Sequence, residues 1–399
     1  MSSVLRYTLH VVVIAIFAFQ AIDLSVSFTE DTHPIVGVSV NIVDLLWQYI
    51  NTSTGGRPAA IKAMQDASSR SFVFYRFAAS AYWPNELRLW FNTTTRTKYW
   101  QAFDELVGDA EKIGARLVPS IAWNQFAFCD VCKEPLQAYF NETSCTQQAI
   151  KRFTEDLVSR YCNSSVILFW ELGNEFNLLA DLDMEGKHTS IAPSKGTPKI
   201  RTKADNVSTD QMIGLYYKWT SWIRAIDPHR LISSGHAVPR ASAQHLRRSY
   251  YMPQRDWTND SREEFEKNLI DVNRPCDIMS VHLYSIYGDN LRFNISTDKH
   301  NADLLRIIKQ TADRAGKILY LGEFGDPLPG DRLFTRNALR VIVEAFIEVS
   351  TVWVWEFYQT SATVPANFSL IPGRDDGIIK CMQSTNVDLK NHSTKWSCD

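Results

Sequence analysis

Two glutamates stand at the ends of short apolar runs, where a carboxylate must either do chemistry or find a partner. Glu175 follows the run over residues 165–173, and Glu323 lies near the end of the run over residues 317–324. A charge that closes a buried strand is costly unless it is paired or used. Two such carboxylates can share the cleavage of a glycosidic bond, because one protonates the leaving oxygen while the other attacks the anomeric carbon. The acid then needs a raised pKa, and the nucleophile must stay ionised.

Other polar and aromatic side chains close further apolar runs in the same way. They are Arg76, Trp123, Asn124, Asn174, His282, Tyr284, Trp353 and Trp355. Any one of them can be a satisfied structural group, but together on one face they are hard to explain as core. Arg76 and Tyr284 are suited to hold Glu323 ionised, the first by its charge and the second by a hydrogen bond. Asn174 is suited to bind a sugar 2-hydroxyl, and Trp355 offers a flat face to a sugar ring.

Eight runs rich in apolar and β-branched residues alternate with longer amphipathic stretches. The runs cover residues 34–40, 71–77, 115–123, 165–173, 230–235, 276–284, 317–324 and 351–357. Apolar residues recur with helical spacing over residues 97–114, 146–161 and 335–350. This alternation predicts a single-domain α/β protein with a closed (β/α)8 TIM barrel. Long polar connections over residues 177–208 and 235–274 follow the fourth and fifth runs, on the face where barrel enzymes carry their sites.

Four segments of the chain resemble glycoside hydrolase family 5 of clan A, which contains the endo-β-mannanases and many cellulases. They are WELGNEFN (170–177), VHLY (281–284), LGEFG (321–325) and VWVWEF (352–357). The resemblance extends from the first apolar run to the eighth. It implies a retaining enzyme in which Glu175 is the acid/base and Glu323 the nucleophile. It also implies supporting roles for Arg76, Asn174, His282, Tyr284 and Trp355.

The third run ends differently from many family members, which place a histidine where Trp123 and Asn124 stand here. We assign Trp123 and Asn124 to substrate binding and interpret the change as a subfamily difference. The expected activity is hydrolysis of a β-1,4-linked polysaccharide or oligosaccharide, mannan first and β-glucan second, and endo action rests on the resemblance alone. An inactive barrel that only binds carbohydrate and a transglycosylase with the same residues are the alternatives. No cofactor and no metal is expected.

Other residues with chemically active side chains have simpler interpretations. Glu171 is expected to point into the barrel or to have a structural ion-pair partner, and Glu356 to support the site from behind. The segment 375–377 (Asp-Asp-Gly) is expected to form a turn. His236 follows the fifth run, where substrate contact and loop structure are equally consistent with it.

The N-terminal 27 residues have the pattern of a secretory signal peptide, which leaves residues 28–399 as one catalytic domain. Arg6 precedes an apolar run over residues 11–22, and Ser25 and Ser27 are small residues near a cleavage point. An uncleaved signal anchor is the alternative; without it we expect no stable membrane insertion. Secretion agrees with nine N-x-S/T sequons, at Asn51, Asn92, Asn141, Asn163, Asn206, Asn259, Asn294, Asn367 and Asn391.

The net charge of −2 and the pI of about 6.5 argue against a nucleic-acid partner. We therefore expect a secreted monomer whose partner is its carbohydrate substrate. The seven cysteines predict disulfides in an oxidising compartment and leave at least one thiol over. The Cys129-x-x-Cys132 pair lacks a second CxxC or paired histidines at metal-ligand spacing, which favours a loop disulfide. Cys381 and Cys398 are predicted to pair and to staple the C-terminal tail.

Overall fold

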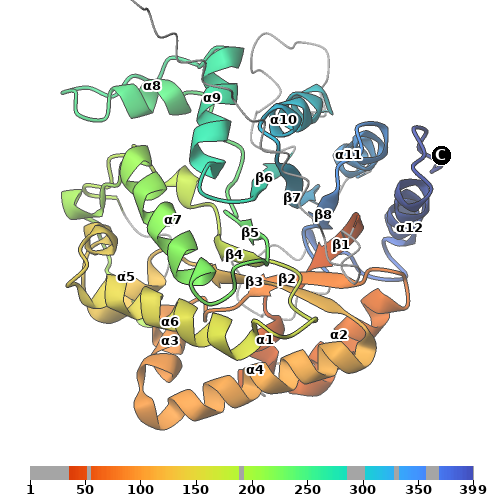
Figure 1. The fold of residues 1–399 in the computed structure, drawn as a ribbon, viewed down its shortest axis with the longest axis horizontal. Helices are drawn as coiled ribbons and strands as arrows, with labels where there is room; N and C mark the ends of the chain where they lie inside the picture. The colour runs from red at the N-terminus through yellow and green to blue at the C-terminus, as the bar shows by residue number, and fades with distance from the viewer. Residues whose placement is uncertain are drawn as a thin grey trace, which may run out of the picture. The chain divides into compact units, whose positions relative to one another are not determined.

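Eight parallel strands follow one another around a closed barrel, with β1 paired to β8 (Figure 1). The strands are β1 Gly37–Asn41, β2 Phe74–Ala78, β3 Arg116–Ala122, β4 Trp170–Gly173, β5 Ile232–Ser233, β6 Ile278–Tyr284, β7 Ile318–Gly325 and β8 Val349–Val352. The computed structural model describes residues 36–51, 55–187, 193–284, 302–327, 332–355 and 368–398. The predicted (β/α)8 barrel is confirmed.

Four predictions made from the sequence fall outside the described residues. They are the signal peptide over residues 1–27, the role of Glu356, and the sequons at Asn294 and Asn367. Within the described ranges, no helix combines the length and the apolar character needed to cross a membrane.

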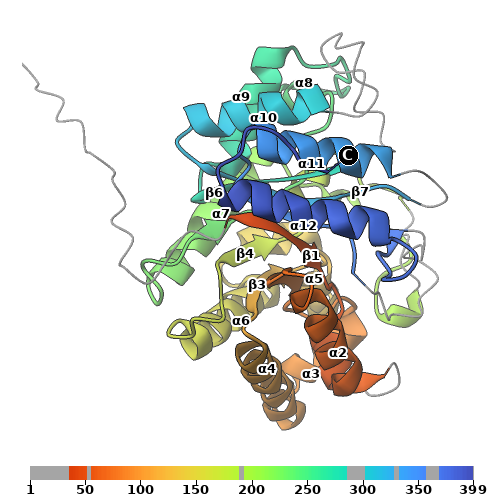
Figure 2. The same ribbon diagram turned by 90° about the vertical axis from the view of Figure 1, so that its right-hand side faces the viewer.

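Helices return the chain from the end of each strand to the start of the next. The α-helices are α1 Leu45–Ile50, α2 Gly56–Ser68, α3 Pro84–Phe91, α4 Thr93–Ile113, α5 Ala127–Cys132, α6 Cys145–Tyr161, α7 Thr209–Arg224, α8 Ala243–Arg248, α9 Arg262–Asn273, α10 Ala302–Arg314, α11 Leu333–Glu344 and α12 Asp376–Lys390. Figure 2 shows α12 lying beside β1, where the Asn386 side chain accepts the Val38 N–H and donates to the Val38 carbonyl. The last helix thus covers the first strand, next to the point where the barrel closes.

Serine residues explain where three of these helices begin. Ser144, Ser208 and Ser261 precede α6, α7 and α9, and each hydroxyl oxygen accepts the N–H three residues further on. Gln211 and Glu264 complete a capping box by accepting the backbone N–H of the capping serine. Such caps satisfy N–H groups that the first turn leaves unpaired, and each contributes about 1 kcal/mol.

The last strand is shorter and earlier than the sequence pattern predicts. Residues 335–350 were expected as helix and 351–357 as strand, but α11 ends at Glu344 and β8 covers Val349–Val352. The break lies at Phe346, whose φ of 50° is left-handed and ends the helical path. Residues 346–349 are still mostly apolar, so the periodicity does not reveal the break. Trp353 and Trp355 therefore follow the strand instead of belonging to it.

The long connections contain more regular structure than their composition suggests. The connection after β4 carries the short 3-10 helices η3 Phe176–Leu178, η4 Pro193–Lys195 and η5 Lys203–Asp205, while a further one, η2 Leu136–Phe140, follows α5. The connection after β5 contains both α8 and α9. The segment expected as a turn at 375–377 instead begins α12 at Asp376.

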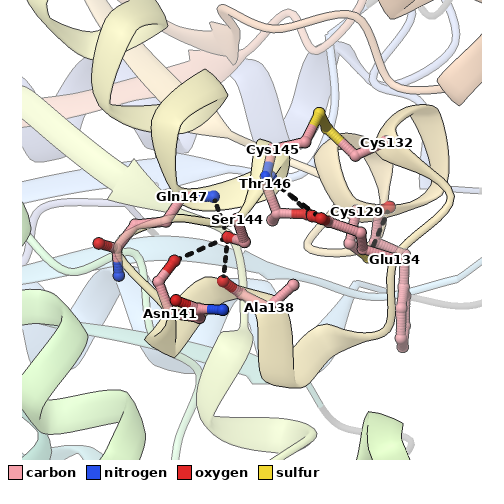
Figure 3. The surroundings of a disulfide bond; sticks show 10 residues. Cys129, Cys132, Glu134, Ala138, Asn141, Ser144, Cys145, Thr146 and Gln147 are labelled. Atoms are coloured by element: carbon pink, nitrogen blue, oxygen red, sulfur yellow. Dashed lines mark hydrogen bonds between the residues drawn. A yellow bond between two sulfur atoms is a disulfide. The ribbon is translucent and has the colours of Figure 1, made fainter.

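The cysteine predictions are partly confirmed. Cys381 pairs with Cys398, as expected. The favoured loop disulfide between Cys129 and Cys132 is wrong, because Cys132 pairs with Cys145 at the start of α6 (Figure 3). Cys129 and Cys132 both belong to the short helix α5, and Cys129 is buried in the core as a free thiol. Although Cys129 and Cys132 are only three residues apart on one helix, Cys129 packs in the core whereas Cys132 bonds to Cys145.

Candidate active site

The guanidinium of Arg76 on β2 lies at the centre of the candidate site and is fully buried. Its Nε donates to Glu171 Oε1 at 2.7 Å, and its Nη1 donates to Glu323 Oε1 at 2.6 Å. Nη1 also donates to Asn41 Oδ1 at 3.1 Å, and Nη2 to Asn174 Oδ1 at 2.8 Å. One side chain therefore joins β1, β2, β4 and β7 at the end of the barrel where those strands terminate.

Glu171 on β4 balances this buried charge. Its side chain is completely buried, and its carboxylate pairs with Arg76. Burial raises the pKa of Glu171, while the Arg76 charge and a hydrogen bond from Ser120 lower it. The expectation that Glu171 has a structural partner is confirmed. An arginine between two carboxylates is tolerated in a dry interior because each charge is paired and hydrogen-bonded.

Glu323 on β7 receives hydrogen bonds on both carboxylate oxygens. Arg76 Nη1 donates to Oε1, and the Tyr284 hydroxyl donates to Oε2 at 2.5 Å. The Glu323 side chain is only 6% exposed. Both predicted partners of Glu323 are confirmed.

Glu175 has a different environment. Its backbone adopts a left-handed φ of 53°, and its N–H donates to the Gly235 carbonyl at 2.8 Å. Burial raises the pKa of Glu175 to about 7, although the positive charges of Arg76 and Arg240 act to lower it. The side chain is nevertheless 29% exposed, so it remains accessible to a ligand. A carboxyl group with this pKa is protonated in a substantial fraction of molecules at neutral pH.

His282 on β6 lies between the two glutamates. Its Nδ1 is 3.0 Å from Glu175 Oε1 and 3.6 Å from Glu323 Oε1. Burial lowers the pKa of His282 to about 3, so the ring is neutral near pH 7. An oxygen of Glu175, an oxygen of Glu323 and a ring nitrogen of His282 all lie within 4.8 Å of one another. The two carboxyl groups are therefore close enough to act on the same bond.

These ligand types could also hold a metal ion, but the surrounding charges argue against one. Arg76 places a permanent cation 2.6 Å from Glu323, and a divalent ion there would meet its repulsion. A second cluster, His245, Asp260 and Glu264, lies away from this site. Its buried member, Asp260, already accepts the N–H groups of Gln244 and His245 at the start of α8. We keep the expectation of a metal-free site as a prediction.

The structure brings four of the predicted supporting residues together around the glutamates: Arg76, Asn174, His282 and Tyr284. Trp123 lies beside them, with the Arg76 guanidinium 4.2 Å from the centre of its ring. Asn124 does not present its amide to the site. It is 4% exposed, donates to the Tyr82 carbonyl and accepts the Phe126 N–H, so it shapes the loop after β3.

Trp355 is not placed at the site. It is completely buried in the hydrophobic core, with its ring edge-on to Phe72 at 5.8 Å. Trp353 is instead partly exposed, and it stacks on Trp123 with ring centres 5.9 Å apart. The wrong assignment of Trp355 follows from the predicted position of β8. Both tryptophans lie beyond the end of the strand, where side chains no longer alternate regularly between the inside and the outside of the barrel. Trp353, and not Trp355, is therefore the tryptophan that lies beside Trp123 and the Arg76 network.

Sequence reasoning also missed two residues and left a third undecided. Burial and the charges of both glutamates raise the pKa of Tyr82, which follows β2 at the same end of the barrel. Arg240 in the connection after β5 interacts electrostatically with Glu175. The functional character expected of that connection was the available signal. His236 is completely buried and stacks on Tyr216, which settles it as a structural residue.

A closed barrel with one glutamate after β4, and a second on β7 that is paired with a buried arginine, has the arrangement of a barrel glycosidase. The family model "Cellulase (glycosyl hydrolase family 5)" matches residues 38–359. The chain therefore belongs to glycosyl hydrolase family 5, and the resemblance seen in the sequence is confirmed.

Relatives with mannan-related names are among the proteins similar to this chain. A probable mannan endo-1,4-beta-mannosidase C from Aspergillus terreus is 26% identical over 152 residues, covering 37% of this chain and 34% of that protein. The match thus spans about a third of the relative's length. Two endo-1,4-beta-mannanase structures share the fold. The Rhizomucor miehei enzyme has a TM-score of 0.61 at 12% identity, covering 91% of this chain and 97% of that one. The Thermotoga petrophila enzyme has a TM-score of 0.58 at 12% identity, covering 89% and 77%.

The different surroundings of the two tryptophans lead to a paired prediction. Trp355→Ala should destabilise the fold by about 3–5 kcal/mol, because it removes a large buried ring. Trp353→Ala should leave the melting temperature close to that of the wild type and weaken turnover by roughly threefold to tenfold, the range expected from one lost ring contact. Thermal melts and kcat/KM of both variants check this. A stable Trp355→Ala variant with a raised KM would reverse the assignment.

Proposed function

We propose that the protein is a retaining glycoside hydrolase that acts on β-1,4-linked mannan, with β-glucan as the second choice of substrate. The observation that carries this proposal is the contrast between two nearby carboxyl groups. Glu323 is held by Arg76 and Tyr284, whereas Glu175 has its pKa raised to about 7. One oxygen of Glu175 lies within 4.8 Å of one oxygen of Glu323, and this closeness is in keeping with the ~5–5.5 Å carboxyl spacing of retaining enzymes.

In the first step, Glu323 attacks the anomeric carbon while the bond to the leaving oxygen breaks. Glu175 gives its proton to that oxygen, so the leaving group departs as an alcohol and Glu175 becomes a carboxylate. In the second step, Glu175 takes a proton from a water molecule, whose oxygen attacks the same carbon and releases Glu323. The product has the β-configuration of the substrate, and both glutamates return to their starting protonation states.

The neighbouring side chains support these two steps. The hydrogen bonds from Tyr284 and Arg76 to Glu323 must weaken as its carboxylate forms the bond to the anomeric carbon. They strengthen again when the free carboxylate is regenerated. Neutral His282 lies within hydrogen-bond distance of Glu175 and adds no positive charge beside it. Asn174, fixed by Arg76, keeps its amide NH2 group for a sugar hydroxyl. Trp353, supported from behind by the buried ring of Trp123, offers an aromatic surface to the sugar ring.

Mannan is placed first because mannan-related names recur among the similar proteins, in one sequence relative and in several fold neighbours. A purely carbohydrate-binding barrel is disfavoured because both carboxylates are present with distinct partners. The two disulfides support a protein that matures in an oxidising compartment, in line with the proposed secretion.

The substrate proposal predicts an order of activities. Purified protein should release reducing ends fastest from mannan or glucomannan, more slowly from cellulose or another β-glucan, and not from α-linked glucan. The Glu323→Gln variant, prepared in parallel, controls for contaminating hydrolases. Faster cleavage of β-glucan than of mannan would contradict the substrate assignment while leaving the reaction type intact.

The roles of the two glutamates predict unlike variants. Glu323→Ala should lose activity on every substrate, because even a good leaving group cannot compensate for the loss of the nucleophile. Glu175→Ala should lose roughly 10²–10⁴-fold on polysaccharide, whose leaving group needs protonation. On an aryl glycoside with an acidic phenol, Glu175→Ala should form the covalent intermediate readily, and added azide should restore turnover with a β-glycosyl azide as product.

Circular dichroism must first show that both variants are folded. A folded Glu175→Ala enzyme with full activity on polysaccharide would show that another group is the acid. An α-configured azide product would contradict the retaining mechanism.

A further inference from the structure

The turn that carries Glu175 is fastened to the segment that follows β5. Glu175 N–H donates to the Gly235 carbonyl at 2.8 Å. Asn177 Nδ2 donates to the Ala237 carbonyl at 2.7 Å, and the Ala237 N–H donates back to Asn177 Oδ1 at 3.0 Å. The Arg240 guanidinium completes the set by donating to the Leu178 carbonyl. Residues 175–178 and 235–240 therefore form one hydrogen-bonded unit.

This unit holds a backbone conformation that is unfavourable in isolation. Glu175 has a φ of 53°, in the left-handed region that a non-glycine residue adopts only at a cost in free energy. Close packing on the other side depends on Gly235, since a Cβ there would lie 1.8 Å from the Gly173 carbonyl oxygen. Contacts with the surrounding residues must therefore hold the turn in this conformation. The hydrogen bond from Arg240 is the last of these contacts along the chain.

Arg240 also brings a positive charge toward Glu175. Burial lowers the pKa of Arg240, and the charge of Glu175 raises it in return. The other charged or titratable groups facing Glu175 come from different elements: Arg76 on β2, Tyr82 after β2, His282 and Tyr284 on β6, and Glu323 on β7. Arg76 shares its charge between Glu171 and Glu323 at ion-pair distance. Arg240 donates to a backbone carbonyl and, within the described residues, has no carboxylate at ion-pair distance. Its positive charge is therefore not offset by an ion pair, as that of Arg76 is.

We infer that Arg240 is a positioning residue for Glu175: it ties down the turn that carries this glutamate and places a positive charge beside its carboxyl group. The inference rests on the proposed role of Glu175 as acid/base. Arg240 stabilises the carboxylate that exists after proton donation and opposes the effect of burial. It thereby limits how far burial can raise the pKa of Glu175, and so sets the upper pH at which the acid is still protonated.

The test compares pH profiles of kcat/KM on a β-1,4-manno-oligosaccharide, whose sugar leaving group must be protonated as it departs. In the wild type, the fall on the basic side reports ionisation of the general acid in the free enzyme. Arg240→Met and Arg240→Gln remove the charge, so Glu175 should stay protonated to higher pH, and the basic limb should move up by roughly half to one unit. This is less than the ~1–3 units of a directly contacting ion pair. Arg240→Lys keeps the charge, and its basic limb should stay with that of the wild type.

Arg255→Met is the matched control: Arg255 lies in the same connection, but in the described part of the chain it contacts Tyr250 and the Ser249 carbonyl and not Glu175. Its profile should coincide with that of the wild type. Arg240→Gln also keeps an N–H donor for the Leu178 carbonyl, so it remains informative if Arg240→Met fails to fold. An unmoved basic limb in the folded neutral variants, with or without a lower kcat, overturns the inference.

Glu175→Ala on the same substrate separates this outcome from a failure of the proposed function. Its profile should lack the basic limb altogether. A limb that persists without Glu175 means that the acid/base assignment itself is wrong, whatever the Arg240 variants show. A limb that disappears in Glu175→Ala but does not move in Arg240→Met leaves the proposed function intact and removes Arg240 from it.

Discussion

The burial of one guanidinium group constrains the whole catalytic end of the barrel. Arg76 has no access to water, so each of its donors must find an acceptor within the protein. Glu171, Glu323, Asn174 and Asn41 supply those acceptors from three other strands. Removing one member of a buried ion pair typically costs about 3–5 kcal/mol, because the remaining charge is left unpaired. The strand ends are therefore fixed relative to one another by the same contacts that hold Glu323.

This arrangement gives two chemically identical side chains different surroundings, on which the roles proposed for them rest. Glu323 lies inside the network, where its carboxylate accepts hydrogen bonds from two donors. Glu175 lies at its edge, where burial dominates over weaker attraction from Arg76 and Arg240, and its pKa rises to about 7. His282 can lie between them because its ring is neutral and adds no charge to either. The division of labour follows from how far each carboxyl group lies from the buried cation.

Much of this arrangement could be predicted from the sequence, because strands of a parallel barrel end on one face. The apolar runs located seven strands well enough to bring Arg76, Asn174, Glu175, His282, Tyr284 and Glu323 to that face. The strand prediction failed around β8, because the apolar pattern continues from the helix into the strand. Beyond β8 this pattern no longer shows which side chains point into the barrel. Trp353 and Trp355 were exchanged for that reason. Tyr82 and Arg240 were missed because loop residues follow no periodicity, and only tertiary contacts place them beside the glutamates.

Trapping of the covalent intermediate tests the division of roles most directly. A 2-deoxy-2-fluoro-β-mannosyl or manno-oligosaccharyl fluoride slows both chemical steps through its ring fluorine, while the fluoride leaving group keeps the first step the faster one. The intermediate should then accumulate, and mass spectrometry of the digested protein should find the sugar on the peptide that contains Glu323. The folded Glu323→Gln variant should carry no label. A label on Glu175, or substrate turnover to an α-configured product without any adduct, would contradict the roles assigned to the two glutamates.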